Sequence, residues 1–513
     1  MPLLGGGLLG SPHGDNLDCI MKDYVLITGA TGLLGRYLLR DLTLADARLA
    51  VLVRPARKAS AWQRVENVMC YWEKDLGRQL PRPVVLEGEI TEPDLGLDSR
   101  GIRWVAENCG RFLHNAASLT FESTSPTGEP WRSNIEGTRN VLELCRHAGI
   151  RQFHHVSTAY VCGLRQGLIL ESDVDVGQTL SNDYEKSKLQ SELSVRNAPF
   201  LDQVTVYRPA IIVGDSVTGH TTTYHGFYAP LQAVAAISIA AERTPTGNIN
   251  ESSRFPLSGH ETKNLVPVDW VSALMTHVFT HPENHGQTYH LTPRHPVTSR
   301  LLADVIEETM GLYRVRFEGG GRSLVGLTEN EALFAQLIQV YASYWKDDPI
   351  FDTTNTDRAA PHLPCPHMNR KVLLMMARHA VSINFTSPRD RPVVPVFDTP
   401  AWLEPLCEAH HAAQPSPEPK IALRVVGHGG GDWTLAFSGG RLVTATPGLP
   451  ERGSPLIETS VDTLLQLREG TVGVPAALAA GQIRPLQGLA PSRAQQIVDD
   501  LLVVTSEAQH LRA

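Results

Sequence analysis

A tyrosine and a lysine four residues apart form the pair with the most recognisable chemistry. Tyr184 and Lys188 lie in the run YEKSK, and their spacing places both side chains on one face of a helix. A nearby ammonium group favours the phenolate and lowers the phenol pKa from its free value of about 10. Such a tyrosine can exchange a proton with a substrate oxygen near neutral pH. Exposed ion-pair helices share this spacing, so other segments must support the assignment.

A hydroxyl from an earlier segment can act on the same substrate oxygen. Thr158 follows Ser157 at the end of an apolar strand, and its hydroxyl can hold an oxygen on which charge develops. His154 and His155 lie inside this strand and are interpreted as packing residues, not as bases. No set of ligand-type residues has the spacing of a metal site, so no metal is predicted.

These side chains need a cofactor site beside them, and the run YVLITGATGLLG at Tyr24–Gly35 predicts one. It reads as a strand, a tight turn and a helix start. Gly29 and Gly32 can adopt turn conformations, and Gly35 lets the following helix, Arg36–Leu42, pack close while its first amides face a pyrophosphate. A glycine-rich turn alone is often only a turn.

The end of the second strand bears on the choice of cofactor. Arg48–Val53 is an apolar strand, and Arg54 follows it where a carboxylate would suit the ribose of NAD. An arginine there suits the additional phosphate of NADP. With Arg57, Lys58 and Arg64 nearby, the sequence favours NADPH, while the alternative is a solvated basic loop.

Two further strands complete the expected cofactor domain. Val84–Ile90 should end under the adenine, and Arg111–Ser118 carries Ala116 and Ala117, which let the backbone pass close to the cofactor. Strands alternate with helix-length connections throughout this half of the chain. The pattern predicts an α/β fold with a doubly wound parallel sheet covered on both faces.

Composition narrows the class of protein. The 513 residues predict roughly three domains. A net charge of -8 provides no basic field, so nucleic acid is not an expected partner. Seven cysteines without a CxxC pair favour a reducing, cytoplasmic location. No apolar run is long enough to span a bilayer or form a signal peptide, and residues 1–21 are predicted to be a disordered leader or an upstream start not always used.

The motifs together resemble the extended short-chain dehydrogenases/reductases. TGATGLLG, HNAA, NIEGTRNVLELC, HVSTAYVCG, YEKSK and YRPAIIVG occur in the family's order between Tyr24 and about Pro296. The resemblance implies an NAD(P)-dependent oxidoreductase and aligns Thr158, not Ser157, with the catalytic hydroxyl. It also suggests that Asn134 relays protons through water to Lys188. The alternative for Asn134 is a helix residue that bonds local backbone.

The resemblance also implies a set of cofactor contacts. Glu89 stands where the family usually presents an aspartate to the adenine amino group, and its longer side chain should still reach. The full predicted set, besides Tyr184 and Lys188, is Gly29, Thr31, Gly32, Leu33, Leu34, Gly35, Arg54, Arg64, Glu89, Ile90, Asn115, Ala116, Ala117, Pro209, Ala210 and Ile211.

Within the family, three segments resemble the fatty acyl and thioester reductase branch, which is male-sterility-like. Ile211–Ile237 is similar to its lid and pocket wall, and Leu52–Glu66 to its cofactor loop. Tyr341–Pro366 is similar to an acidic-aromatic signature beyond the core, although a capped helical hairpin would explain it equally. We therefore expect a catalytic domain over residues 22–300 and a helical substrate extension over 301–384.

The last part of the chain has its own pattern. Residues 385–418 are rich in proline and predict a linker. Residues 419–513 alternate strands and helices in an order that resembles a sterol-carrier-protein domain, a small α+β unit around an apolar tunnel. LLQLREG and AAGQIRPLQG carry this resemblance, but a packed core would explain the same apolar residues.

The expected function is an NADPH-dependent reductase of a lipid-like carbonyl. The favoured substrate is a fatty acyl or polyketide thioester, carried by coenzyme A or an acyl carrier protein, reduced to aldehyde or alcohol. Alternatives are a sterol or hydroxy-lipid dehydrogenase, a nucleotide-sugar epimerase or dehydratase, and a lipid carrier with an NADP-sensing domain. The sequence leaves the oligomeric state open.

Overall fold

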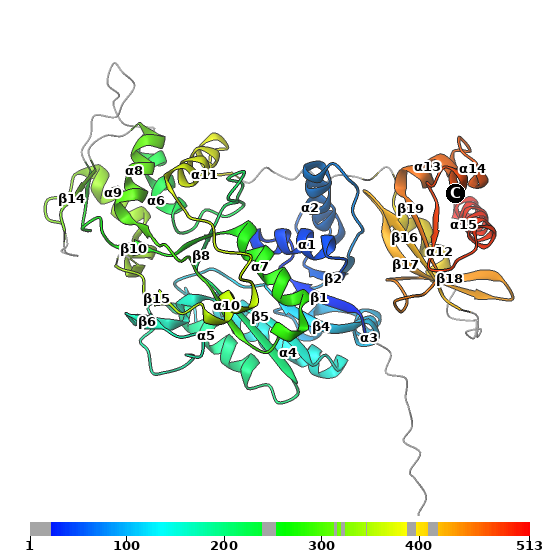
Figure 1. Ribbon diagram of the computed structural model, residues 1–513, viewed down its shortest axis with the longest axis horizontal. Helices are drawn as coiled ribbons and strands as arrows, with labels where there is room; N and C mark the ends of the chain where they lie inside the picture. Colours follow the sequence, from blue (N-terminus) through cyan, green and yellow to red (C-terminus); the bar gives the residue numbers. More distant parts are fainter. Residues whose placement is uncertain are drawn as a thin grey trace, which may run out of the picture.

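The computed structural model describes residues 22–238, 253–311, 315–319, 324–344, 346–386, 395, 397–408 and 419–512 (Figure 1). The predicted leader over 1–21 and most of the non-helical part of the predicted linker lie outside these residues. Of the helices described, none has both the length and the apolar character that crossing a membrane would need.

A sheet of seven parallel strands forms the centre of the molecule. Its order is β12-β7-β5-β4-β1-β2-β3, and the order reverses between β1 and β4. Ligands of doubly wound sheets bind at such a reversal, beyond the carboxyl ends of the strands. The sheet confirms the predicted α/β fold with a doubly wound parallel sheet. The strands are β1 (Tyr24–Thr28), β2 (Arg48–Val53), β3 (Val84–Glu87), β4 (Cys109–His114), β5 (Gln152–Val156), β7 (Gln203–Pro209) and β12 (Thr288–Leu291).

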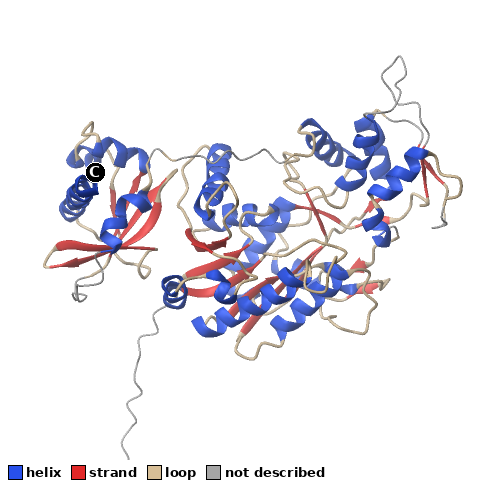
Figure 2. Ribbon diagram, turned by 180° about the vertical axis from the view of Figure 1, so that it is seen from behind, coloured by secondary structure: helices blue, strands red, loops and turns tan. Residues whose placement is uncertain are grey.

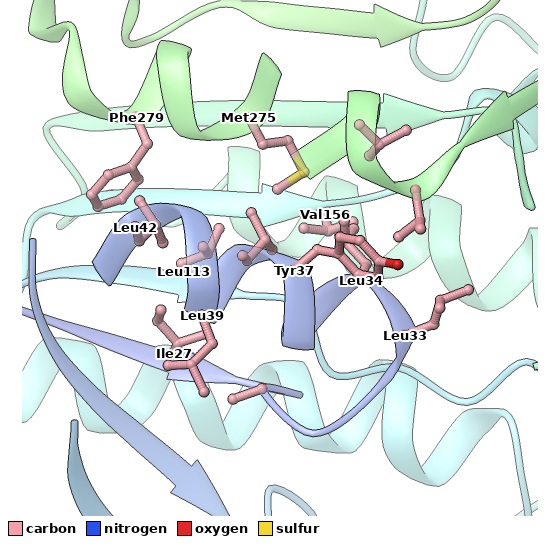
Figure 3. Packing of buried hydrophobic residues seen from close by; sticks show 14 of the residues in the cluster. Ile27, Leu33, Leu34, Tyr37, Leu39, Leu42, Leu113, Val156, Met275 and Phe279 are labelled. Atoms are coloured by element: carbon pink, nitrogen blue, oxygen red, sulfur yellow. The ribbon is translucent and has the colours of Figure 1, made fainter. Parts of the chain in front are cut away.

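Helices cover both faces of this sheet because its strands are apolar on both sides. Val25 and Ile27 of β1 belong to one core together with residues of α1 and α7, and Figure 3 shows Ile27 beside Leu39 of α1. Leu26 belongs to the opposite core, with residues of α3 and α4. The helices of the first face are α1 (Leu33–Leu44), α2 (Ala61–Leu76) and α7 (Val268–Thr280), and those of the second are α3 (Ser99–Asn108), α4 (Gly137–Ala148) and α5 (Asp183–Arg196).

A second group of elements, which we call the substrate wing, lies beyond the carboxyl ends of the strands. It contains α6 (Tyr228–Ser238), α8 (Ser299–Met310), α9 (Glu329–Leu337) and α11 (Arg370–Ser382), with β8 (Ile211–Val213), β9 (Ser253–Phe255), β10 (Thr262–Lys263), β11 (Leu265–Pro267), β13 (Val297–Thr298) and β14 (Val315–Phe317). An extension, η5 (Gln339–Tyr344), β15 (Ile350–Phe351) and α10 (Thr354–Ala359), returns to the core, where β15 pairs with β6 (Leu168–Ile169). Short turns are η1 (Pro93–Gly96) and η4 (Pro282–Asn284).

The C-terminal residues form a separate five-stranded sheet with its own core. The strand order is β18-β17-β16-β19-β20. Its elements are β16 (Ile421–Val426), β17 (Gly431–Ser438), β18 (Arg441–Pro447), β19 (Leu456–Ser460), β20 (Arg484–Leu486), α12 (Thr399–Glu408), α13 (Val461–Arg468), α14 (Val474–Ala479) and α15 (Pro491–Arg512). The predicted linker differs here, because α12 lies inside it and buries Trp402 and Leu403 in the C-terminal core. Apolar burial outweighs the proline content of this stretch.

The C-terminal domain docks on the catalytic core away from the substrate wing (Figures 1 and 2). The backbone N–H of Leu449 donates to Tyr24 Oη at 2.6 Å. The indole N–H of Trp104 donates to the Pro447 carbonyl at 2.8 Å, and Arg452 forms an ion pair with Asp46 at 3.5 Å. Because Tyr24 is the first residue of β1, the contact lies at the amino ends of the central strands.

Candidate active site

A cavity of about 670 Å³ runs from the glycine turn after β1 into the substrate wing. Every predicted cofactor residue except Gly35 lines it, as do the predicted catalytic residues Thr158, Tyr184 and Lys188. The lining members of the predicted cofactor set are Gly29, Thr31, Gly32, Leu33, Leu34, Arg54, Arg64, Glu89, Ile90, Asn115, Ala116, Ala117, Tyr184, Lys188, Pro209, Ala210 and Ile211. One continuous space therefore joins the expected cofactor end to an apolar end.

The glycine turn has the close approaches that its sequence predicts. Gly29 has φ +71°, and a Cβ there would lie 2.8 Å from the backbone N of Ala116. A Cβ on Gly35 would lie 2.0 Å from the Gly29 carbonyl oxygen, so α1 can approach the turn only with glycine at that position. The N-cap of α1 is Gly32, which has no side-chain cap. The first amides of α1 are thus open to an anionic group such as a pyrophosphate.

Two arginines and a glutamate line the end of the cavity beside β2 and β3. Arg64 donates to Thr31 Oγ1 at 2.8 Å and to the Arg54 carbonyl at 2.6 Å, which fixes its guanidinium beside the glycine turn. Arg54 is 71% exposed and forms an ion pair with Glu89 at 3.3 Å. Burial, followed by the Arg54 charge, lowers the pKa of Arg64. The sequence did not predict that Glu89 faces Arg54.

Thr158 and Tyr184 are brought together at the centre of the cavity. Thr158 caps η3 (Ala159–Cys162) by accepting from the Tyr160 N–H at 3.3 Å, and its hydroxyl donates to the Pro209 carbonyl at 3.4 Å. The hydroxyl also lies close enough to Tyr184 to lower the pKa of that phenol. Burial raises the pKa of Tyr184 to about 12, with the Thr158 hydroxyl acting against the rise and the Glu185 charge adding to it. The expected lowering of the Tyr184 pKa is therefore absent from this structure. Desolvation of the phenolate outweighs the neighbouring groups.

Lys188 lies one helical turn beyond Tyr184 and is 3% exposed. Its ammonium donates to the Val156 carbonyl at 2.7 Å, at the end of β5. Burial lowers the Lys188 pKa to about 8, and the Glu192 carboxylate opposes this shift. The ammonium is thus held by the strand end, and its expected effect on the phenol is not seen.

Asn134 lies in a π-helical turn, η2 (Arg132–Glu136), and is 1% exposed. Its side-chain NH₂ donates to the Ser118 carbonyl at 3.1 Å and to Ser187 Oγ at 2.9 Å, while its oxygen accepts from the Ser118 N–H at 2.8 Å. Both donors therefore have protein partners. Asn134 ties the loop after β4 to α5, and its role as a proton relay stays a prediction.

The strand histidines are buried and neutral. Burial lowers the pKa of both His154 and His155 well below the usual value. His154 Nδ1 lies 3.0 Å from the hydroxyl of Tyr207 inside the core. These contacts agree with the interpretation of both residues as packing residues.

Sequence reasoning missed the aromatic wall of the cavity. The ring of Phe121 contacts those of Tyr184, Tyr341 and Tyr344 at centroid distances of 5.6, 5.3 and 5.7 Å. Phe255, Phe317 and Phe334 line the end of the cavity inside the substrate wing. The run YASY was the available signal, but turn chemistry explained that segment equally well.

One group of metal-type ligands lies outside this cavity. Among the residues that the structure describes, ligand atoms of Glu66, Cys70 and His428 all lie within 4.8 Å of one another. Glu66 is already bound by Arg82, with Nε 2.9 Å from Oε1, in a buried ion pair. The group belongs to the contact between α2 and the C-terminal domain, and none of it lines the cavity.

The fold and the site define the class of protein. The parallel sheet, the open amides of α1, and Thr158, Tyr184 and Lys188 around one cavity fit an NAD(P)-binding fold of the extended short-chain dehydrogenase/reductase type. Within that class, residues 27–275 match the NAD-binding family described as male sterility protein.

Curated relatives are similar to part of the chain. Aldehyde reductase lnaA of Aspergillus flavus is 25% identical over 378 residues, covering 66% of this chain and 34% of that protein. The isonitrile lipopeptide synthase of Mycobacterium tuberculosis is 31% identical over 211 residues, covering 37% of this chain and 8% of that protein. The chain spans about a third of the length of lnaA and a smaller share of the synthase.

Solved structures share the fold. The terminal R domain of the myxalamid PKS-NRPS pathway has a TM-score of 0.57 at 24% identity, covering 71% of this chain and 92% of that one. A thiolation-reductase di-domain from an archaeal non-ribosomal peptide synthetase has a TM-score of 0.54 at 19% identity, covering 71% and 76%. At these identities the likeness concerns architecture.

Proposed function

We propose that the protein is an NADPH-dependent reductase of an acyl thioester. The observation that carries this proposal is one continuous cavity, in which Thr158 and Tyr184 lie between the glycine turn with its open amides and an apolar, aromatic wing. A thioester carbonyl at this point would meet two hydroxyl donors, with its acyl chain against apolar side chains. The names of similar proteins, an aldehyde reductase and a thiolation-reductase di-domain, support the same proposal.

The residues around the turn suit the proposed cofactor. The amides of Leu33 and Leu34 would hold the pyrophosphate, and Arg54 and Arg64 would hold the additional phosphate of NADPH. Glu89 opposes these charges, so the preference over NADH depends on Arg54 leaving its ion pair with Glu89. The remaining predicted contacts, from Ile90 to Ile211, would enclose the adenosine and the nicotinamide.

The chain's own groups would then act on the substrate. When bound, the nicotinamide supplies a hydride to the carbonyl carbon. Thr158 and Tyr184 hold the carbonyl oxygen, Tyr184 protonates it, and Lys188 binds the ribose and resupplies protons, with Asn134 beside the helix. The resulting hemithioacetal then loses its hydroxyl proton, the C–S bond breaks, the sulfur takes up a proton and leaves as the thiol, and the aldehyde remains. A second hydride and proton would convert it to the alcohol.

The substrate that the protein turns over and the product that it forms distinguish the proposed function from its alternatives. Purified protein with NADPH should oxidise the cofactor on addition of acyl-pantetheine or acyl-coenzyme A thioesters, with release of one thiol per aldehyde. Hydroxysteroids with NADP⁺ test the dehydrogenase alternative, and nucleotide sugars test the epimerase. Turnover of either set without thioester turnover would overturn the proposal, and no turnover with tight lipid binding would favour a carrier.

The carrier-protein partner and the C-terminal domain are finer parts of the proposal. A thioester tethered to an acyl carrier protein would enter the same cavity. Residues 419–513 are proposed to bind acyl chains or sterols, supported by their strand-helix order and apolar core. A fluorescent fatty acid titrated into the full chain and into a variant lacking this domain tests the second point, because equal binding would exclude it.

A further inference from the structure

Three side chains of the kind that bind metals meet where helix α2 contacts the C-terminal domain. Glu66 and Cys70 lie four positions apart on α2, so both share one face of the helix. His428 comes from the turn between β16 and β17. Cys70 Sγ and His428 Nε2 each lie 3.9 Å from Glu66 Oε2, and the ligand atoms of the three residues all lie within 4.8 Å of one another. A thiol, an imidazole and a carboxylate from two domains therefore face a single point.

The separations between these ligand atoms are close to those of a zinc site. Zinc binds thiolate sulfur at about 2.3 Å and imidazole nitrogen or carboxylate oxygen at about 2.0–2.2 Å, which places the ligands of a tetrahedral site roughly 3.5 Å apart. The two separations at Glu66 Oε2 need to shorten only slightly to reach this value. A small rotation of the Cys70 or His428 side chain would bring the remaining pair into the same range.

His428 reaches this point from a turn that needs glycine on both of its sides. A Cβ on Gly427 would lie 2.9 Å from the Gln79 side-chain nitrogen, and one on Gly429 would lie 1.8 Å from the Phe397 carbonyl oxygen. Within the described part of the chain, His428 Nε2 is buried and has no hydrogen-bond partner. A buried ring nitrogen without a partner costs stability, which suggests that it binds a ligand.

Arg82 holds the Glu66 carboxylate and still leaves it able to bind an ion. Arg82 Nε donates to Glu66 Oε1 at 2.9 Å, and Arg82 Nη2 donates to Oε2 at 3.2 Å. Because a carboxylate oxygen has two lone pairs, Oε2 can accept this hydrogen bond and also bind a cation. Hydrogen bonds to a metal-binding carboxylate keep it in the position that the ion needs. Arg82 therefore fixes the carboxylate in front of Cys70 and His428.

The charges around this point favour a divalent cation. Arg82 also pairs with Glu73 at 2.6 Å, so one guanidinium faces two carboxylates and the group has one negative charge in excess. Zinc binds the thiolate form of cysteine, so its binding releases the Cys70 proton and adds a second negative charge. The two charges of the ion then balance the group. The side chains of Glu66 and Arg82 are 2% and 3% exposed, so water does little to screen an excess charge here.

We propose that Glu66, Cys70 and His428 bind a zinc ion that fastens the C-terminal domain to the catalytic core, with water as the fourth ligand. Thiolate and imidazole ligands favour zinc, whereas magnesium and calcium prefer oxygen ligands alone. None of the three residues lines the cavity that holds Thr158 and Tyr184, so the proposal does not depend on the proposed function. Spacing along the chain could not indicate the site, because His428 belongs to another domain.

The metal content of the full chain is the first test. Protein stripped with a chelator, reloaded with zinc and desalted should carry one zinc ion per chain by plasma mass spectrometry. Cys70→Ser and His428→Ala should bind zinc at least about 100-fold more weakly, since loss of a residue that only supports a ligand already costs roughly 10–100-fold. Cys365→Ser is the matched control, because Cys365 is also a half-buried free thiol but lies outside the group. It should keep the native zinc content. With cobalt in place of zinc, the sulfur-to-cobalt absorption band should be lost in Cys70→Ser and kept in the control.

Thermal stability gives a second readout. Added zinc should raise the melting temperature of the native protein and of Cys365→Ser, because a ligand that binds only the folded state stabilises it. It should not raise that of His428→Ala, which changes a turn residue and keeps the test usable if Cys70→Ser folds poorly. A native protein that carries no zinc after reloading overturns the proposal. Equal zinc in the native protein and in both ligand variants also overturns it, because the ion is then bound elsewhere. None of these measurements uses turnover, so failure of the proposed function would leave them unaffected.

Discussion

At the scale of single residues, the hydroxyl of Tyr184 is the group on which the proposed chemistry depends. Tyr184→Phe removes it and leaves the ring against Phe121. Turnover should fall at least about 100-fold, the scale of a lost general acid, while NADPH affinity stays nearly unchanged. Stopped-flow oxidation and a fluorescence titration measure the two quantities. A variant that keeps most of its rate would show that another group donates the proton.

The choice of cofactor depends on another single residue. Arg54→Asp should weaken NADPH far more than NADH, by about 2–3 kcal/mol if Arg54 holds the additional phosphate. The new carboxylate would also face Glu89, which adds repulsion near that phosphate. Arg57→Asp is the control, because Arg57 is exposed and does not line the cavity. Equal affinity of the native protein for both cofactors would contradict the prediction.

The functional residues that could be identified from the sequence are those whose spacing along the chain follows from local turn or helix geometry. The glycine turn and the pair Tyr184 and Lys188 have fixed spacings that follow from turn and helix geometry. By contrast, Tyr344 meets Glu185 from 159 positions away, and no periodicity encodes such a contact. The pKa of Tyr184 was unpredictable for the same reason, because burial depends on the whole cavity wall.

At the scale of elements, the first turn of α1 sets how closely the cofactor can approach. Gly35→Ala would place a Cβ 2.0 Å from the Gly29 carbonyl, so α1 or the turn must move. Stability should fall by about 1–3 kcal/mol, with a loss of NADPH affinity. Gly101→Ala is the control at the equivalent position of α3, where a Cβ meets nothing closer than 3.4 Å. Urea unfolding should show it unchanged or slightly more stable; a matching loss there would remove the explanation.

Element types were predictable where apolar periodicity was long, as in the strands of the parallel sheet. The clearest miss is α12, where prolines predicted a linker. Trp402 and Leu403 find partners only in the folded C-terminal sheet, so the helix depends on contacts that the local sequence does not contain. The substrate wing was predictable as helical, whereas its aromatic wall was not.

At the scale of the whole molecule, the C-terminal domain has its own core, so we expect it and the catalytic part each to fold when they are separated. A fragment starting near Pro417 would lack α12, so the fragment expected to fold should begin near Pro395. The remaining catalytic part should keep thioester turnover, because the described C-terminal domain contributes nothing to the cavity lining. Its melting temperature should fall, since Tyr24, Trp104 and Asp46 lose their partners.

Turnover rates measured with acyl thioesters of different chain length test whether the C-terminal domain takes part in the reaction. The domain lies at the amino ends of the strands, away from the cavity lining, so its removal should leave the rates with short and with long acyl thioesters equally unchanged. A selective loss with long chains would indicate that the domain delivers them to the cavity.

Strand β1 also connects two distant sites, the glycine turn and the contact with the C-terminal domain. One end carries the glycine turn, and the first residue at the other end, Tyr24, receives the Leu449 amide. A strand in the middle of a parallel sheet opens only with its neighbours, so exchange of its amide hydrogens reports the most stable unit of the core. If release of the C-terminal domain requires β1 to open, a cofactor bound at the glycine turn should slow hydrogen exchange of the Leu449 amide. By reciprocity of binding free energies, a domain that holds β1 closed would tighten the cofactor by the same factor.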